Sequence, residues 1–387
     1  MFDCIVVGAG LAGAVVAEHI ARVLKKTVLI IEQRHHIGGN AYDYYNEDGI
    51  LIHSYGPHIF HTNNRDIWDY LSRYNQWHFY NHRVLGYIDG QTVPLPFNLN
   101  TLYFLFTQKK AESIEDSLNK AYTIGDQVSI FELKKQKDPN LQLLGDYVFN
   151  NVYLNYTVKQ WDKNPDELNP SVVRRVPVRI SRDNRYFRDR FQGTPEGGYT
   201  QLVSSLLENK YIKVLLNTNC KEVLRVDPNS NKILFLGSEF SGRLIYTGKI
   251  DEFLDYRFGK LPYRSLDFRF KTLNKEYAFE AGSVNYPNDY AFTRITEYKH
   301  LTGQKHPRTT IAEEYPKAYK TNSGDIPYYP ILTKENLQLY EKYKKEAQKL
   351  DNLYLLGRLA EYKYYNMDAV VEAAIKLFTE RLMNGQS

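Results

Sequence analysis

The feature that most constrains this chain is a glycine motif, Gly8-Ala9-Gly10-Leu11-Ala12-Gly13, which directly follows a short apolar run. Cys4 to Val7 predict a buried strand before it, and Ala14 to Leu24 predict a helix after it. A second apolar run from Thr27 ends in Glu32, 32 − 13 = 19 residues after the last glycine. Such glycines bring a pyrophosphate to a helix N-terminus, and an acid about 20 residues later binds ribose. These forty residues predict a dinucleotide-binding βαβ unit; the alternative is a glycine turn in another βα unit.

The residues after the acid indicate which dinucleotide is bound. Glu32 would repel a 2′-phosphate, which argues against NADP. A second glycine pair follows in Gly38-Gly39-Asn40. This arrangement resembles the two-dinucleotide-binding flavoproteins, whose FAD stays bound. The expected cofactor is therefore FAD rather than a diffusing NAD.

Length and composition limit the class of protein. At 387 residues, two or three domains fit the size, and 43% hydrophobic with 25% charged residues is typical of a soluble globular chain. No apolar stretch approaches about 20 residues, and the N-terminus runs directly into the first strand, so we expect neither a transmembrane helix nor a secretory signal. The only cysteines, Cys4 and Cys220, fit a reducing cytoplasm. A net charge of +5 allows an anionic substrate but predicts no nucleic-acid partner.

Patterns along the chain predict an α/β fold in which a Rossmann-like FAD-binding domain carries a helical insertion domain and an antiparallel-sheet domain. Asp89-Gly90 between apolar runs predicts a hairpin over 83–95, and 98–155 is helical in pattern. The expected FAD-binding domain comprises 1–75, 195–250 and 335–387; the helical domain 99–172, with a mobile loop at 161–177; and the antiparallel-sheet substrate domain 76–98, 173–194 and 251–334.

A run of arginines provides candidate anion-binding groups. Seven arginines fall within 190 − 174 + 1 = 17 residues: Arg174, Arg175, Arg179, Arg182, Arg185, Arg188 and Arg190. A guanidinium binds phosphate bidentately and keeps its charge. We expect most of them to form a solvated, ion-paired face and one or two to bind a diphosphate. An RNA-binding role is the weaker alternative.

Residues near the C-terminus and in one histidine pair are candidates for the flavin end of the cofactor. Asn366 directly precedes the last predicted helix, whose dipole would stabilise a negatively charged reduced flavin by about 0.3–1 kcal/mol. Arg358 follows a strand and a glycine and is placed to touch cofactor phosphate. His58 and His61 have no nearby acid or cysteine to complete a metal site, so no metal is expected. They are expected beside the flavin ring; the alternative is two structural histidines.

Together, the motifs resemble the bacterial UDP-galactopyranose mutase family nearly from end to end. The matching segments are Gly38-Gly39-Asn40, Tyr55 to Thr62, Pro94 to Asn98, Tyr156-Thr157-Val158-Lys159-Gln160-Trp161, Arg174 to Arg179, Phe191-Gln192-Gly193, Thr293-Arg294, Pro327 to Pro330 and Gly357 to Tyr365.

The resemblance implies an FAD-dependent isomerase that interconverts UDP-galactopyranose and UDP-galactofuranose with no net redox change. The reduced flavin N5 would attack the sugar anomeric carbon with transient loss of UDP, and UDP would then return. An external reductant such as NAD(P)H would activate the enzyme, and a homodimer is familiar in the family.

The resemblance also assigns roles to individual residues. The implied catalytic residues are Arg175, Arg294 and His61. The implied substrate contacts are Asn81, Tyr156, Thr157, Trp161, Tyr186, Asn285, Tyr329 and Tyr364. The cofactor contacts expected from the fingerprint and the resemblance are Gly8, Gly10, Ala12, Gly13, Glu32, Gln33, Gly39, Asn40, His58, Ile59, Arg358, Tyr365, Asn366, Met367 and Asp368.

Two positions depart from the family pattern. Asn366 stands where an acid is familiar, which removes a negative charge near the cofactor edge. Pro57 stands where a small alanine is common and could reshape the sugar pocket to admit UDP-N-acetylgalactosamine. The competing hypotheses are an FAD-dependent oxidoreductase of the amine-oxidase type and a non-catalytic sugar-nucleotide sensor.

Overall fold

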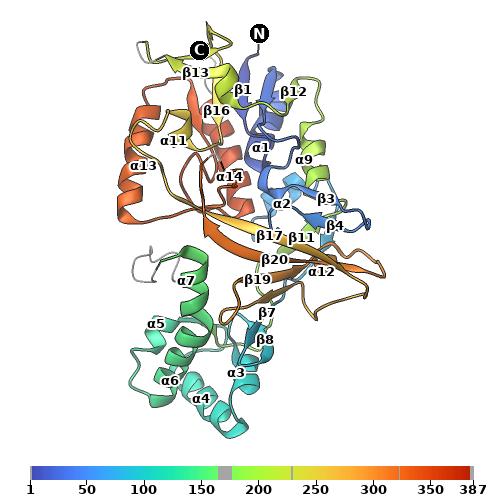
Figure 1. Cartoon of the computed structure of the whole chain (residues 1–387), viewed down its shortest axis with the longest axis vertical. Coiled ribbons are helices and arrows are strands. Elements are labelled where there is room, and N and C mark those ends of the chain that lie inside the picture. The colour runs from blue at the N-terminus through green and yellow to red at the C-terminus, as the bar shows by residue number, and fades with distance from the viewer. Residues whose placement is uncertain (1, 164–176, 228–229, 322, 384–387) are drawn as a thin grey trace.

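The first strand of the chain lies at the centre of a parallel sheet in the computed structural model, which describes residues 2–163, 177–227, 230–321 and 323–383 (Figure 1). The strand order is β12-β2-β1-β16-β22. Their bounds are Cys4–Val7 (β1), Val28–Ile31 (β2), Ile212–Leu215 (β12), Arg243–Tyr246 (β16) and Leu353–Leu355 (β22). The two apolar runs predicted to be strands, Cys4 to Val7 and the run from Thr27, are therefore confirmed as β1 and β2.

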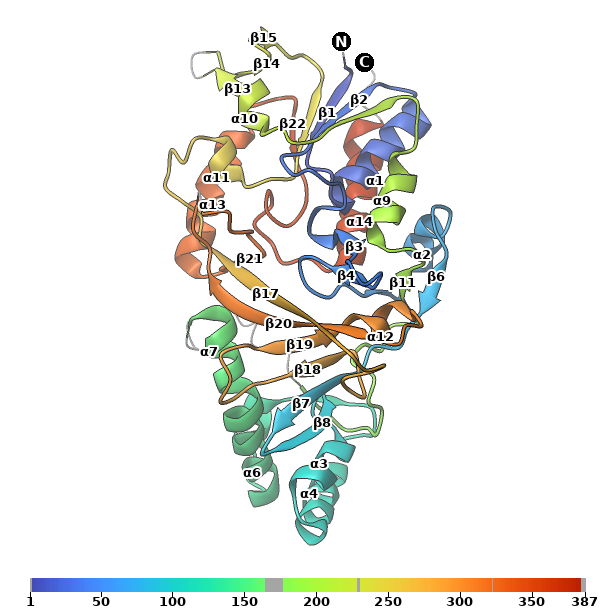
Figure 2. The same ribbon diagram turned by 45° about the vertical axis from the view of Figure 1, so that its right-hand side comes forward.

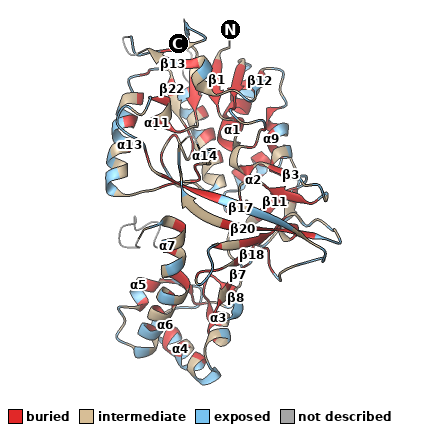
Figure 3. Ribbon diagram, viewed as in Figure 1, coloured by how far each residue is buried: buried red, intermediate tan, exposed pale blue. Residues whose placement is uncertain are grey.

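Both faces of this sheet are covered, which explains why the central strands β1 and β2 are continuously apolar. On one face, Val6 and Ile30 pack against the helices α1 (Leu11–His19), α9 (Tyr199–Leu207) and α14 (Met367–Leu377). On the other face, Ile5 and Leu29 pack with residues of α11 (Ile250–Phe253) and α13 (Lys334–Ala347). Figure 3 shows the outer sides of the helices as exposed, and the central strands β1, β2 and β16 are mostly buried, whereas the edge strand β12 is mostly exposed. The expected Rossmann-like architecture is confirmed.

A buried carboxylate on α1 fixes that helix to the segment around α2 (Arg65–Leu71). Glu18 is only 3% exposed and accepts hydrogen bonds from Tyr70 Oη at 2.9 Å and Tyr74 Oη at 2.5 Å. Arg22 on the next turn pairs with it as well. Burial alone would raise the pKa of Glu18, but the hydrogen bonds from His19, Tyr74 and Arg22 outweigh it and lower the pKa to about 2.

A second, seven-stranded sheet crosses the middle of the molecule in the order β21-β17-β20-β19-β18-β7-β8 (Figure 2). Its strands are Val84–Ile88 (β7), Gln91–Leu95 (β8), Tyr263–Leu273 (β17), Ser283–Asn285 (β18), Arg294–Glu297 (β19), Thr309–Ala318 (β20) and Tyr329–Pro330 (β21). The predicted hairpin over 83–95 is present as β7 and β8, and β8 is an edge strand, as Pro94 requires. The sheet is not wholly antiparallel, because β18 joins β7 in parallel.

Helices hang below this sheet in Figure 1 as an insertion between β8 and β10 (Pro177–Arg179). They are α3 (Leu99–Leu105), α4 (Gln108–Ala121), α5 (Ile130–Leu133), α6 (Pro139–Val148), η3 (Phe149–Leu154) and α7 (Asn155–Trp161), with the short strand β9 (Gln127–Ser129) paired to β10. Trp161 ends α7, so the expected loop does not begin at this residue. Residues 164–176 lie outside the described part of the chain, and the mobile-loop prediction falls mostly there.

The remaining elements support these three parts. A three-stranded sheet joins β5 (Phe60–Thr62), β11 (Phe191–Pro195) and β6 (Trp77–Phe79), and another joins β13 (Leu224–Asp227), β14 (Lys232–Phe235) and β15 (Ser238–Glu239). The remaining short elements are β3 (Asp43–Tyr45), β4 (Leu51–His53), α10 (Cys220–Val223) and α12 (Tyr298–Thr302). No described helix has the length and apolar character needed to cross a membrane.

The Glu18 contacts predict a pH-dependent loss of stability. The pKa falls from 4.5 to about 2 on folding, so the carboxylate stabilises the fold above pH 4.5 and this contribution is lost as the pH drops towards 2. Glu18→Gln should lower the free energy of unfolding by about 2–3 kcal/mol at pH 7. The difference in the free energy of unfolding between wild type and variant, measured by urea unfolding, should become smaller below pH 4.5. A difference that stays constant down to about pH 3.5 would contradict this assignment.

Candidate active site

The glycine motif folds into a turn where backbone segments touch. Gly8 has φ +104°, and a Cβ on Gly13 would lie 2.1 Å from the Gly8 carbonyl oxygen. A Cβ on Gly39 would lie 2.8 Å from Gly10 Cα, and the Gly38 amide donates to Ala9 O at 2.9 Å. The second glycine pair therefore packs directly on the first motif, and a side chain at position 39 would separate them, whereas one at position 13 would collide with the Gly8 carbonyl.

A cavity of about 430 Å³ opens at this turn. Most of the residues predicted to contact the cofactor line it: Gly8, Gly10, Ala12, Glu32, Gln33, Gly39, Asn40, His58, Arg358, Tyr365 and Met367. Four predicted residues do not: Gly13, Ile59, Asn366 and Asp368. Gly13 packs on the strand side of the turn, and Ile59 packs with Ile50 and Ile52.

The cavity wall fits a dinucleotide. At Gly10 an added Cβ would make only ordinary contact with the protein, 3.6 Å from Gly39 Cα, so the protein itself does not require a glycine there. Glu32 is 6% exposed, and its carboxylate accepts the Ala9 and Arg34 amides at 2.8 and 3.0 Å, which fixes it at the cavity edge. A free face at Gly10 and an acid beside it suit a pyrophosphate and a ribose.

Two helices begin at this cavity without a side-chain cap. Gly10, the N-cap of α1, has no side chain. Asn366 is the N-cap of α14, and its side chain accepts no hydrogen bond from a first-turn amide. Asn366 therefore directly precedes the last long helix, as predicted, but its side chain does not cap the helix. Free amides at two helix N-termini favour negative charge, which suits the pyrophosphate and a reduced flavin. Asp368 accepts only the Ala369 amide, at 2.8 Å.

The two candidate histidines occupy different places. His58 lines the cavity, and burial, helped by nearby His53 and Arg358, lowers its pKa to about 3, so the ring is neutral. Its Nδ1 lies 2.8 Å from Gly56 O, which can only accept, so Nε2 is left as an acceptor. His61 does not line this cavity; it stacks on Phe187 at 3.7 Å, with Nδ1 2.9 Å from Asp189 Oδ2.

A row of polar residues crosses the seven-stranded sheet. Asn285, Arg294 and Glu314 are directly opposite one another on β18, β19 and β20, so they share one face. Arg294 Nη2 donates to both Glu314 oxygens, at 3.1 and 2.9 Å. The buried Arg294 Nε and Asn285 Oδ1 have no partner within the described residues. Burial would lower the pKa of Arg294, but Glu314 and neighbouring tyrosines raise it, so the guanidinium stays charged.

Those neighbours are tyrosines from three distant segments. Tyr156 on α7, Tyr186 and Tyr329 on β21 all lie within electrostatic range of Arg294. Tyr329 stacks on Tyr364 at 5.7 Å and lies 6.0 Å from the Trp161 ring. Burial raises the pKa of Tyr156 and of Tyr329, so both phenols remain hydrogen-bond donors. Such donors around one guanidinium suit a phosphate group.

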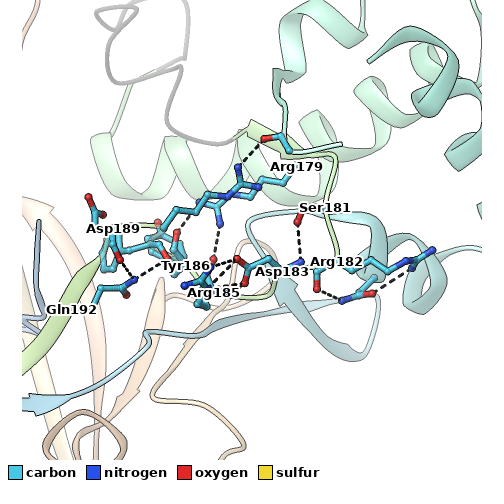
Figure 4. A network of polar contacts seen from close by, with 12 residues as sticks. Arg179, Ser181, Arg182, Asp183, Arg185, Tyr186, Asp189 and Gln192 are labelled. Atoms are coloured by element: carbon cyan, nitrogen blue, oxygen red, sulfur yellow. Dashed lines mark hydrogen bonds and ion pairs between the residues drawn. The ribbon is translucent and has the colours of Figure 1, made fainter. Parts of the chain in front are cut away.

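The arginine run behaves mainly as a structural element (Figure 4). Arg182 pairs with both oxygens of Glu115 at 2.8 Å, and Arg185 pairs with Asp183 at 2.7 Å, so the predicted ion-paired face is confirmed for these two. Arg179 is instead buried and donates to the carbonyls of Arg185 and Tyr186 at 2.6 and 2.7 Å. Arg175 lies outside the described residues.

Placement of the other predicted substrate contacts is uneven. Thr157 is buried on α7 next to Tyr156. Asn81 is exposed in the segment between β6 and β7. The sequence analysis missed Glu314, the partner of Arg294, and Arg34, which lines the cavity and donates to Asn40 Oδ1 at 2.8 Å.

The sequence analysis also missed cavity residues that follow the parallel strands, Thr218 to Cys220 after β12 and Thr247 to Lys249 after β16. Both strands lie in the segment 195–250 that was assigned to the FAD-binding domain, and ligands bind at the carboxyl ends of strands in such sheets. That rule could have found them.

Comparison with known proteins decides the family. The family model described as UDP-galactopyranose mutase matches residues 151–364, and a model of the NAD(P)-binding Rossmann-like domain matches residues 6–74. The UDP-galactopyranose mutase of Mycoplasma genitalium is 38% identical over 97% of this chain and 93% of its own length. The chain belongs to the UDP-galactopyranose mutase family. It is an FAD-dependent isomerase.

Other members and neighbours show how far this similarity reaches. The dTDP-fucopyranose mutase of Escherichia coli is 35% identical over 97% of both chains. The relatives of this chain are thus named for more than one sugar nucleotide. A crystal structure of reduced UDP-galactopyranose mutase has the same fold, with a TM-score of 0.71 at 16% identity over 98% of this chain and 96% of that chain. Putrescine oxidase shares the fold at a TM-score of 0.57 and 10% identity over 96% of this chain and 97% of that chain.

The glycine geometry predicts that two neighbouring substitutions act differently. Gly13→Ala places a Cβ 2.1 Å from Gly8 O and should both lower the melting temperature and abolish FAD binding. Gly10→Ala should change the melting temperature of the apoprotein little, within roughly 2 °C, because its Cβ has space in the protein. It should still reduce the FAD content per protein, read from flavin absorbance. Full FAD content in Gly10→Ala would show that this face does not meet the cofactor.

Proposed function

We propose that the enzyme interconverts UDP-galactopyranose and UDP-galactofuranose, with FAD in its reduced state. The observation that carries this proposal is the position of Arg358. It lines the FAD cavity, and its guanidinium carbon lies 5.3 Å from the ring centres of both Tyr329 and Tyr364. The cluster formed by Arg294 with Tyr156, Tyr186, Tyr329 and Tyr364 is therefore contiguous with the cofactor cavity. A sugar attached to a diphosphate held in the cluster would extend towards the flavin.

Bound and reduced, FAD supplies a nucleophilic nitrogen for the anomeric carbon, so that sugar–phosphate cleavage needs no net oxidation. The protein's part is to bind and orient the substrate. Arg294 binds the diphosphate through the donors that Glu314 leaves free, and Glu314 holds the guanidinium plane against β20. The phenols of Tyr156 and Tyr329 donate to phosphate oxygens. Keeping UDP beside the sugar during the reaction raises the rate of its return.

Two observations support other sugars as candidate substrates. The segment containing Pro57 passes close to Glu314, because a Cβ on Gly56 would lie 3.9 Å from Glu314 Oε2 and 3.0 Å from the Phe268 ring. The E. coli relative acts, by its name, on a dTDP-linked 6-deoxy sugar. The test below is therefore also run in separate assays with UDP-N-acetylgalactosamine and with dTDP-fucose.

The first prediction concerns the redox state of the cofactor. With UDP-galactofuranose and dithionite or NAD(P)H, chromatography should show UDP-galactopyranose forming over many turnovers while the reductant is not consumed in proportion. The oxidised enzyme should be inactive, because oxidised flavin has no nucleophilic nitrogen. Equal rates for the oxidised and reduced protein would disprove this mechanism. Oxygen uptake in proportion to sugar consumed would establish the amine-oxidase type of chemistry instead.

The second prediction separates activity from stability at Arg294. Arg294→Ala should lose a phosphate contact of about 1.5–3 kcal/mol and reduce turnover roughly 10- to 150-fold while FAD stays bound. It also leaves Glu314 buried and unpaired, at a cost of about 3–5 kcal/mol in stability. Adding Glu314→Gln should therefore restore the melting temperature but not the turnover.

Arg294→Lys is the matched control, because it keeps the charge but loses the planar fork and should recover little activity. Near wild-type turnover in Arg294→Ala would show that another group binds the diphosphate.

A further inference from the structure

A lysine that none of the roles above uses lies between two parts of the active site. Lys159 is on α7, between Tyr156 and Trp161. Its ammonium enters the loop 286–292 that joins β18 to β19. There Nζ lies 2.5 Å from Tyr286 O, 2.9 Å from Tyr290 O, 3.2 Å from Asn288 O and 3.3 Å from Phe292 O.

This arrangement is specific for an ammonium group. The four oxygens come from alternate residues of the loop and converge on one point, and an ammonium has three N–H donors to share among them. Burial lowers the pKa of Lys159 to about 8, and Asp289 partly offsets it, so the charged form predominates at pH 7. A neutral side chain there would remove the donor from the partly buried carbonyl groups of Tyr286 and Phe292.

Other contacts of α7 point the same way. Asn155, one turn before Lys159, donates to Asn288 Oδ1 at 3.0 Å, and Asn288 Nδ2 donates to Asn151 O at 3.0 Å. Residues 151, 155 and 159 are spaced by four and therefore form one stripe on the helix. The loop contacts this stripe along two turns, with Lys159 as its charged end.

The two elements joined in this way carry different groups of the site. Tyr156 and Thr157 belong to α7, whereas Asn285 ends β18 and Arg294 begins β19. The far end of α7 is fixed separately by the buried Arg264 of β17, which donates to Gln160 O at 2.9 Å. Lys159 is thus the charged contact that sets α7 against the loop leading directly to Arg294.

We propose that Lys159 is a positioning residue. It holds the helix that carries Tyr156 and Thr157 in a fixed position relative to Arg294, so that the helix residues and Arg294 bind the same sugar nucleotide. The expected effect on kcat/KM rests on the proposed function, whereas the expected effect on the position of the helix does not. Lys159 does not line the FAD cavity, so cofactor binding should not depend on it.

The test uses the FAD-loaded enzyme at pH 7 and Lys159→Met, which keeps the length of the side chain and removes the charge. Hydrogen exchange followed by mass spectrometry should show faster exchange in both 149–163 and 286–293, with unchanged FAD content. The value of kcat/KM should fall at least about tenfold, mostly through a higher KM, because the binding groups are no longer held together. Lys110→Met is the control, since Lys110 makes one hydrogen bond to Asn140 in the helical insertion.

A second variant keeps the proposal testable if Lys159→Met fails to fold. Asn288→Ala removes the side-chain bonds to α7 but leaves the ammonium, so it should change exchange and KM in the same direction by less. In the double variant the effects should not add, because both act through one contact. Unchanged exchange in both segments, or a fall in kcat alone, would overturn the proposal. Faster exchange in an enzyme inactive on all the sugar nucleotides would refute the proposed function while upholding the role of Lys159.

Discussion

The arrangement of the candidate site depends on one ion pair between neighbouring strands. Arg294 and Glu314 face each other across β19 and β20, and Glu314 is only 2% exposed. A buried pair of this kind stabilises little, since removing two charges from water offsets their attraction. Its value is geometric: Glu314 occupies a single guanidinium nitrogen and holds the plane, while the other donors remain for an anion. The tyrosines that surround it come from α7, the 181–190 segment and β21, so the helical insertion and the seven-stranded sheet meet at this pair.

Cofactor and substrate regions are joined by a second arginine. Arg358 Nη1 and Nη2 donate to the carbonyls of Tyr328 and Tyr365 at 3.1 and 2.8 Å, which fixes the guanidinium between the FAD cavity and the tyrosine rings. Its charge adds to that of Arg294 and to the free amides of the two helix N-termini. Arg294 is paired with Glu314, and Asp368 lies in the first turn of α14, so Arg358 and the N-terminus of α1 contribute most of the positive charge. The region is therefore built for an anion beside a cofactor that itself becomes negative on reduction.

Sequence reasoning located the cofactor region well because its determinants are local. Gly8, Gly13 and Glu32 lie within one βαβ unit, and their spacing alone fixes the turn and the acid. The Arg294–Glu314 pair could not be found in this way, because it depends on the register that places two residues twenty positions apart opposite each other on β19 and β20. Likewise, the arginine run suggested an anion site, but its described members mostly bind carboxylates and carbonyls nearby. Which arginine faces a ligand is decided by tertiary packing, and Arg179 is the clearest example.

The fold itself does not decide between an isomerase and an oxidase, since putrescine oxidase shares it. The charges beside the cofactor do. Putrescine is a dication at neutral pH, and binding it calls for carboxylates or an aromatic cage free of arginines. Here the aromatic rings are present, but Arg294 and Arg358 lie among them and would repel an amine. Positive charge among the rings disfavours an amine and favours an anionic substrate. Charged side chains placed on a common scaffold can therefore decide which substrate reaches the cofactor.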